Sequence, residues 1–197
     1  MCNPLSSPTV FLNYLFAGNV TDVPFIANST GTVGTGGGNI TIIGSLFSTG
    51  CNVGVGAGIC SLVAAGSRTS ITCSAPANDV GAQALVVMCG NATSNSNVTL
   101  LYVLPTLSGI APSSITIAGN VSVTVSGRGF GPACSVTIAG KACNTLQAIV
   151  DTAIVCLAPA NPAGAQKVAV KCGAYVAEDL VLTYGKSTHA DLTATCS

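Results

Sequence analysis

Apolar and polar residues alternate in short runs along most of the chain, and clusters of turn residues separate these runs. The clearest run is Val121 to Ser126, and it is followed by residues 127–132, which contain three glycines and a proline. Alternation predicts that Cys134, Val136 and Ile138 share one face of the next strand. Further short strands are expected at 135–138, 153–157, 167–172 and 180–184. About seven such strands in roughly 80 residues, without helical periodicity, predict a two-sheet β-sandwich.

The same pattern occurs twice. Eight of the ten cysteines form two groups of four with identical gaps of 9, 13 and 16 residues, offset by 83. The groups are Cys51, Cys60, Cys73, Cys89 and Cys134, Cys143, Cys156, Cys172. Nearer the start of each repeat the offset becomes 81, which pairs Asn39 with Asn120 at the start of equivalent strands. A two-residue difference within the repeat explains the change, so we predict an internal duplication.

The duplication predicts an all-β chain with two tandem domains, at residues 23–104 and 105–185. Residues 1–22 belong to neither repeat and form an N-terminal β-strand segment, and residues 186–197 form a C-terminal tail. The composition agrees, because 49% of residues are hydrophobic and only 6% are charged. A formal net charge of zero does not predict binding to nucleic acid, which requires an excess of Lys and Arg to neutralise the phosphates.

No membrane-spanning helix is expected, because a span needs about 18 consecutive apolar residues. The best candidate, Val10 to Ala17, is short and contains Asn13 and Tyr14. The N-terminus also lacks the basic region of a signal peptide. For a secreted protein, this sequence is therefore expected to be a mature form or an incomplete precursor.

Catalysis is not expected. Glu178 and Asp179 are the only adjacent acids, and neighbours on a strand point to opposite faces. The single histidine, His189, has no triad partners in the tail. Gly34 to Gly38 superficially resembles a phosphate loop, but it lacks the following lysine and helix, so a flexible strand connection is expected. We predict no enzyme activity, no cofactor and no metal site.

The cysteine groups predict disulfide bonds, and hence an extracellular location. The alternative is that the cysteines bind zinc. Zinc sites use tight pairs of cysteines separated by two to four residues, and no such pair is present.

The second repeat carries motifs of a known family. Pro105, Leu107, Ile110 and Pro112 are followed by Val123, Val125, Gly127, Gly129 and Phe130, and the repeat closes with Ile154, Cys156, Pro159 and Tyr184. This pattern resembles the IPT/TIG domain strongly over 105–185 and loosely over 23–104. The resemblance implies two immunoglobulin-like β-sandwiches. It leaves function open, because similar domains occur in receptors, adhesins, starch-acting enzymes and DNA-binding factors.

The resemblance also implies a disulfide pairing. The first and fourth cysteines of each group would join neighbouring strands, as Cys51–Cys89 and Cys134–Cys172. The middle cysteines would then pair as Cys60–Cys73 and Cys143–Cys156. The alternative is that cysteines pair in the order in which they occur, as 51–60 and 73–89.

Cys2 and Cys196 lie outside the duplication, one near each end. Termini at opposite poles of a tandem would be too far apart for an intrachain bond, which needs Cα atoms within about 7 Å. One hypothesis is a head-to-tail bridge from Cys196 of one subunit to Cys2 of the next. The alternative is that each pairs locally or stays a free thiol.

Six N-glycosylation sequons are present, and covalent glycans are expected on exposed ones if the source is eukaryotic. They begin at Asn19, Asn28, Asn39, Asn91, Asn97 and Asn120. Within the N-terminal segment, Val10, Leu12, Tyr14 and Phe16 form a β-prone apolar strand. This strand either packs on the first domain as an extra edge strand or adds to the sheet of a neighbouring subunit.

Together these features predict an extracellular structural glycoprotein, a subunit of a fibre or surface filament assembled head-to-tail as a homo-oligomer or polymer. The alternative is an adhesion or receptor ectodomain fragment that binds a protein or carbohydrate. A third possibility is an accessory module of a secreted enzyme, which predicts catalytic sequence beyond these termini.

Overall fold

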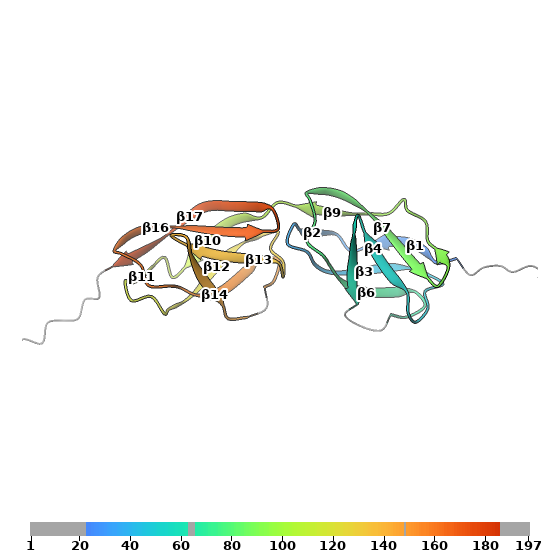
Figure 1. Cartoon of the computed structure of the whole chain (residues 1–197), viewed down its shortest axis with the longest axis horizontal. Coiled ribbons are helices and arrows are strands. Elements are labelled where there is room, and N and C mark those ends of the chain that lie inside the picture. The colour runs from blue at the N-terminus through green and yellow to red at the C-terminus, as the bar shows by residue number, and fades with distance from the viewer. Residues whose placement is uncertain (1–22, 63–65, 148, 186–197) are drawn as a thin grey trace, which may run out of the picture.

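The computed structural model describes residues 23–62, 66–147 and 149–185, and every regular element in these ranges is a strand. The two domains lie end to end in an extended arrangement (Figure 1). The first contains β1 (Phe25–Ser29), β2 (Thr32–Gly34), β3 (Gly38–Ser45), β4 (Asn52–Val55), β5 (Gly58–Leu62), β6 (Ser70–Ala75), β7 (Gly81–Cys89), β8 (Ala92–Thr93) and β9 (Thr99–Val103). The second contains β10 (Thr106–Ala111), β11 (Ser114–Thr116), β12 (Ser122–Arg128), β13 (Cys134–Ile138), β14 (Lys141–Thr145), β15 (Ala153–Leu157), β16 (Gly164–Cys172) and β17 (Tyr175–Gly185).

Each domain is a sandwich of two sheets with the same order of strands. In the first domain the hydrogen-bonded order is β1-β3-β6-β5-β4-β7-β9-β2, and β8 pairs with β7. In the second domain the order is β10-β12-β15-β14-β13-β16-β17-β11. β5 and β14 pair with a strand of each sheet, so they join the two sheets along one edge. The predicted immunoglobulin-like fold and its duplication are therefore present.

Alternation along the strands builds two separate cores. Val136, Ile138 and Cys134 are buried on one face of β13, as the pattern predicts. Phe47 and Phe130 occupy equivalent core positions, and each is 2% exposed. The remaining core residues are mainly valine, isoleucine and leucine, whose branched side chains suit the inner face of a sheet.

The registers correct the expected equivalence of Asn39 and Asn120. Ile40 lies opposite Cys73 and Val123 lies opposite Cys156, so the offset of 83 already applies at these strands. The counterpart of Asn39 is therefore Ser122. Asn120 is an extra residue in the turn before β12, where it adopts a left-handed φ of 57°. The offset between the two domains therefore rises in two steps. It is 81 at β1 and β10, where Ile26 corresponds to Leu107, and 82 at β2 and β11, where Val33 corresponds to Ile115. The two-residue difference is thus divided between the turns before and after β2.

No helix in the described ranges has the length and apolar character needed to cross a membrane.

Candidate functional site: the junction between the two domains

The connection between the domains is very short. β9 ends at Val103 and β10 begins at Thr106, so only Leu104 and Pro105 link the two sandwiches. Pro105 is buried, and the Leu104 carbonyl lies against Gly129 of the second domain. A two-residue linker holds the facing ends of the domains in contact.

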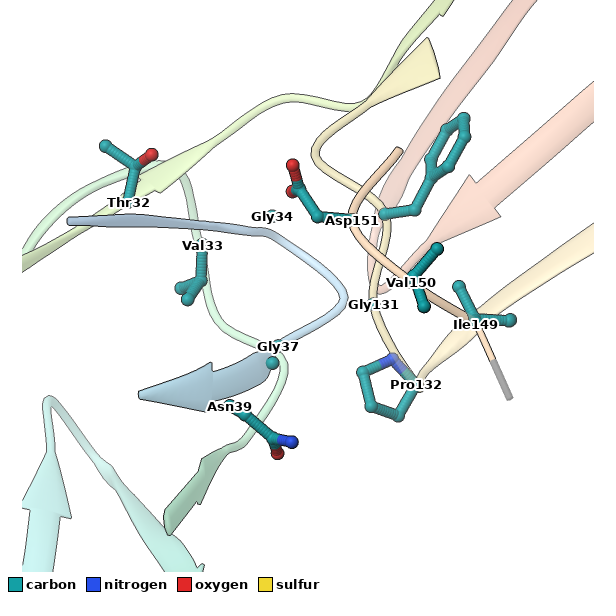
Figure 2. Close-up of a pocket in the computed structure, with 12 residues that line it drawn as sticks. Thr32, Val33, Gly34, Gly37, Asn39, Gly131, Pro132, Ile149, Val150 and Asp151 are labelled. Carbon is teal, nitrogen blue, oxygen red and sulfur yellow. The ribbon is translucent and has the colours of Figure 1, made fainter. Parts of the chain in front are cut away.

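The main contact is between two loops. Residues 34–38, which form the turn from the end of β2 to the start of β3, face residues 129–134, which lead from β12 to the start of β13 (Figure 2). The Ala133 N–H donates a hydrogen bond of 3.1 Å to the Gly36 carbonyl. The Thr35 hydroxyl donates to the Cys172 carbonyl at 3.4 Å, and Thr35 is fully buried. The second domain therefore covers this loop of the first domain and supplies hydrogen-bond partners for its polar groups.

Glycine is required at this contact because the two backbones touch. A Cβ atom at Gly34 would lie 1.8 Å from the Gly129 carbonyl oxygen, and one at Gly131 would lie 2.0 Å from the Gly37 oxygen. At Gly36 the same atom would lie 2.6 Å from Cys134 Sγ. No side chain fits at these distances without a shift of the backbone. The segment connects two strands as expected, but the expectation of flexibility is wrong, since residues 34–37 are buried in the contact.

A second contact extends the junction on another side. The Val80 N–H donates to the Tyr175 hydroxyl at 3.4 Å. Gly173, in the turn between β16 and β17, lies close to the Thr35 carbonyl and to the Ala77 side chain. Contacts on two sides of one short linker restrict both bending and rotation between the domains.

A shallow cleft of about 310 Å³ opens beside the loop contact. Thr32 and Asn39 line it from the first domain, and Pro132, Val150 and Asp151 line it from the second (Figure 2). Asp151 accepts a hydrogen bond of 3.2 Å from the Gly129 N–H, so it stabilises the loop that receives the first domain. The cleft brings together no pair of acids and no nucleophile with a base, and the described residues contain no group of three or more His, Cys, Asp or Glu that could hold a metal ion.

Four disulfide bonds connect strands within the domains. Cys51 pairs with Cys89 at a Cα–Cα distance of 4.2 Å, and Cys134 pairs with Cys172 at 4.1 Å. Cys60–Cys73 and Cys143–Cys156 have Cα–Cα distances of 5.7 and 5.5 Å, and each ties the strand shared by the two sheets to its neighbour. This is the pairing that the family resemblance implies. Sequential pairing is absent.

A tyrosine contact in each domain was not predicted from the sequence. The Tyr102 hydroxyl donates to the Pro76 carbonyl at 2.8 Å, and Tyr184 donates to the Pro159 carbonyl at 2.7 Å. Burial raises the pKa of Tyr102, while a hydrogen bond with Asn78 partly opposes this shift. The repeated Ala-Pro segments and closing tyrosines are the signal that could have revealed this pair.

The predicted modification and assembly residues fall into two sets. Five of the sequon asparagines are exposed: Asn28, Asn39, Asn91, Asn97 and Asn120. The others lie outside the described residues, namely Asn19, Cys2, Cys196, Val10, Leu12, Tyr14 and Phe16, as does His189.

The fold and junction define a class of protein: a tandem of disulfide-bonded β-sandwiches with a closely packed boundary. The family model of the IPT/TIG domain matches residues 24–102 and again residues 105–188. The chain belongs to the IPT/TIG domain family, as the sequence motifs indicated.

Solved structures with similar folds include two of the plexin A4 extracellular region. The form with domains 1 to 8 has a TM-score of 0.54 and 20% identity, and the match covers 82% of this chain and 18% of that one. The form with domains 1 to 10 has a TM-score of 0.50 and 19% identity, covering 83% and 16%. A surface glycan-binding protein from a xyloglucan utilization locus of Bacteroides uniformis matches with a TM-score of 0.42 and 18% identity, covering 82% and 49%. This chain spans less than a fifth of the plexin chains, and no curated protein sequence matches it significantly.

Proposed function

We propose that this chain is an extracellular structural glycoprotein, a rigid two-domain rod that serves as one link of a fibre or surface filament. The observation that carries the proposal is the junction, where glycine backbones in contact fix one sandwich against the other. A rod of defined shape sets a fixed spacing between its two ends, which a flexible tandem does not do.

An extracellular location is supported by the disulfide bonds. All eight cysteines of the two domains are paired, and bonds of this kind persist in oxidising compartments. The five exposed sequons supply sites where glycans would make a surface with few charges more soluble. The fold shared with the plexin A4 extracellular region agrees with this location.

Head-to-tail assembly is supported by the positions at which the described chain begins and ends. β1 lies at one end of the rod and the close of β17 lies at the other (Figure 1). Cys2 precedes Val23 by 21 residues and Cys196 follows Gly185 by 11 residues. We propose that Cys196 of one copy pairs with Cys2 of the next.

The N-terminal segment is a further proposed assembly element. β1 is the edge strand on which it would pack within its own domain. The Asn95 side chain already occupies part of that edge, because it accepts from the Ile26 N–H at 2.7 Å and donates to the Ile26 carbonyl at 2.9 Å. This bridge opposes strand addition at Ile26 in every copy alike. We therefore propose that Val10 to Phe16 adds to a different sheet edge, in a neighbouring copy.

Electrophoresis without reducing agent tests the covalent part of this proposal. The wild-type protein is expected to give a ladder of multimers that collapses to monomer on reduction. Cys2→Ser and Cys196→Ser should each abolish the ladder without lowering the temperature at which the domains unfold. Wild-type protein that remains a monomer on the gel would contradict interchain bonding.

The alternative function is that of an adhesion or receptor ectodomain, and the cleft beside the junction favours it. Asn39, Thr32 and Asp151 supply polar groups at an open site that both domains build. Binding to an array of glycans and cell-surface proteins, compared between wild type and Asp151→Asn, tests this function. Specific binding that the substitution weakens would support a ligand site, whereas no binding above background would favour the structural role.

A further inference from the structure

The two loops that meet at the junction have counterparts at the outer ends of the rod. We define the distal loop as Thr116 to Gly119, at the outer end of the second domain. It has the backbone of residues 34–37: Gly119 N–H donates to the Thr116 carbonyl at 3.0 Å, as Gly37 donates to Gly34 at 2.9 Å. Ile117 N–H donates to the Gly185 carbonyl at 3.1 Å, as Thr35 donates to Val103 at 3.0 Å.

We define the proximal loop as Leu46 to Cys51, at the outer end of the first domain. It resembles residues 129–134 at its first residue and at its cysteine, but differs at Gly50, whose φ of 87° has no counterpart at Ala133. Leu46 has a φ of 61° where Gly129 has 73°, and the Ser48 N–H contacts Cys51 Sγ at 3.2 Å where Gly131 contacts Cys134 Sγ at 3.1 Å. The chain therefore presents both partners of its own junction at its two ends.

The side chains at the outer loops are larger than those at the junction. Ile117 is 39% exposed where Thr35 is fully buried, and Leu46 is 39% exposed where the junction has glycine. A leucine in the left-handed region is strained, and strain of this kind persists where it has a use. Phe25 and Ile43 are also exposed beside the proximal loop, where the second domain has Thr106 and Ser126.

These side chains exclude a copy of the internal contact and favour a different one. Thr116 and Ser48 replace glycines that have no room for a Cβ atom at the junction, so the backbones cannot approach as closely. A cleft of about 300 Å³ with a mixed apolar and polar lining lies instead at the proximal loop. Its lining residues are Leu46, Phe47, Ser48, Thr49, Gly66, Ser67, Arg68 and Cys89. An isoleucine side chain is of a size to enter such a cleft.

We propose that the distal loop of one copy docks on the proximal loop of a second copy, with Ile117 inserted beside Leu46. This inference rests on the proposed function and names the non-covalent contact that orders the fibre. The contact joins two different surfaces, so it is a head-to-tail contact that repeats from copy to copy. Because the surfaces lie at opposite ends of a rod, the repeat extends along the rod axis as a filament and not as a closed ring.

The same arrangement brings the terminal segments together. At the internal junction only two residues separate Val103 from Thr106, and the equivalent positions at the proposed contact are Gly185 of one copy and Phe25 of the next. The tail of one copy and the N-terminal segment of the next would therefore start from neighbouring points. At up to about 3.4 Å per residue, both segments are long enough for Cys196 to meet Cys2.

Sedimentation velocity over a range of concentrations tests the proposal in the 197-residue chain that carries Cys2→Ser and Cys196→Ser. This parent removes the interchain bond, so its behaviour is independent of the gel ladder. Reversible association that rises with concentration is expected. Ile117→Asp and Leu46→Asp should each weaken association by about tenfold or more, because each variant loses an apolar side chain from the contact and must desolvate a carboxylate there instead. Val181→Asp is the matched control, since Val181 is exposed on the flank of β17, and it should leave association unchanged.

Leu46→Gly separates a docking role from a folding role. Glycine removes the side chain and accepts the left-handed conformation that Gly129 already uses. The variant should therefore unfold at a temperature no lower than the parent while associating more weakly. A parent that stays monomeric at all concentrations would overturn the proposal, even if the wild-type ladder forms. So would association that survives Ile117→Asp and Leu46→Asp but is lost on deletion of residues 1–18, because the N-terminal strand would then be the docking element.

Discussion

The two domains share strand order and disulfide pairing, yet their surfaces differ sharply in charge. Residues 23–104 contain two charged residues, Arg68 and Asp79, whereas residues 105–185 contain seven. On equivalent outward-facing positions of β7 and β16, the first domain has Ala84 and Met88 where the second has Lys167 and Lys171. Fold therefore depends on features common to both copies, which are the buried alternation, the cysteines and the turns. The outer faces have changed without affecting it.

The domains also differ where they meet. The first domain has Gly34 and Gly36 in the loop between β2 and β3, and the second has Thr116 and Ala118 at the same places. Only the first of these loops contacts a neighbouring domain within the chain. Glycine is therefore present where two backbones touch and is replaced where they do not.

The disulfide bonds test most strongly whether the two copies are equivalent. Replacing both Cys51 and Cys89 by alanine should destabilise the first domain by roughly 2–5 kcal/mol. Replacing Cys60 and Cys73 should cost about 1 kcal/mol less, because the pairs are separated by 38 and 13 residues and shorter loops lose less closure entropy. Calorimetry should give the same order for Cys134–Cys172 and Cys143–Cys156, whose separations are identical. A reversed order in one domain would break the equivalence.

The Asn95 bridge distinguishes the domains, because no described side chain makes the same pair of bonds to Leu107, the counterpart of Ile26. Asn95→Ala removes two hydrogen bonds to the β1 backbone and should destabilise the first domain by about 1–3 kcal/mol. The second calorimetric transition should not move. Asn91→Ala in unglycosylated protein is the control, since Asn91 is an exposed turn residue. Equal effects of the two substitutions would show that the bridge does not stabilise β1.

The tyrosine contacts should behave alike at neutral pH. Tyr102→Phe and Tyr184→Phe each remove a hydrogen bond to a proline carbonyl and should cost about 1 kcal/mol in their own domain. Denaturant titration that resolves the two transitions measures both values. A loss confined to one domain would show that the two contacts are not equivalent.

The loss of stability at alkaline pH provides a second test at Tyr102. Because burial raises its pKa, the folded first domain holds the phenolic proton more tightly than the unfolded chain does. Its contribution to stability is complete below the ordinary tyrosine pKa of about 10, and is lost as pH rises toward the folded-state value. Tyr102→Phe should reduce this loss when the unfolding free energy is measured as a function of pH. An equal loss at alkaline pH in the variant would show that Tyr102 is not its source.

The smallest effect is expected from making the second domain resemble the first on its surface. Lys167→Ala with Lys171→Met removes the ion pair between Lys167 and Glu178, whose side chains are 63% and 44% exposed. Exposed pairs contribute roughly 0–1 kcal/mol, so the unfolding free energy should change by less than about 1 kcal/mol. Denaturant titration checks this value. A larger loss would show that the charged face stabilises the second domain.

The sequence predicted the scaffold well because the scaffold depends on local patterns. Alternation placed Val136 and Ile138 in the core, and the cysteine spacing revealed the duplication. The junction was not predicted, because a run of glycines such as 34–38 indicates conformational freedom when it is viewed alone. Its burial depends on Gly129 and Gly131, nearly 100 residues away, and on a distance between backbones that no local pattern encodes. Asn95 was missed for a similar reason, since its partner Ile26 is distant in the sequence.

Nuclear spin relaxation of backbone amides tests the central claim, that the junction makes the two domains one rigid body. Both domains of the wild-type protein should fit a single elongated diffusion tensor. Gly34→Thr introduces the residue that the second domain has at this position, and it should give two separate tensors while both domains remain folded. Gly109→Ala, at a glycine with open space around it, should leave the single tensor intact. Independent tumbling of the domains in the wild-type protein would contradict the account.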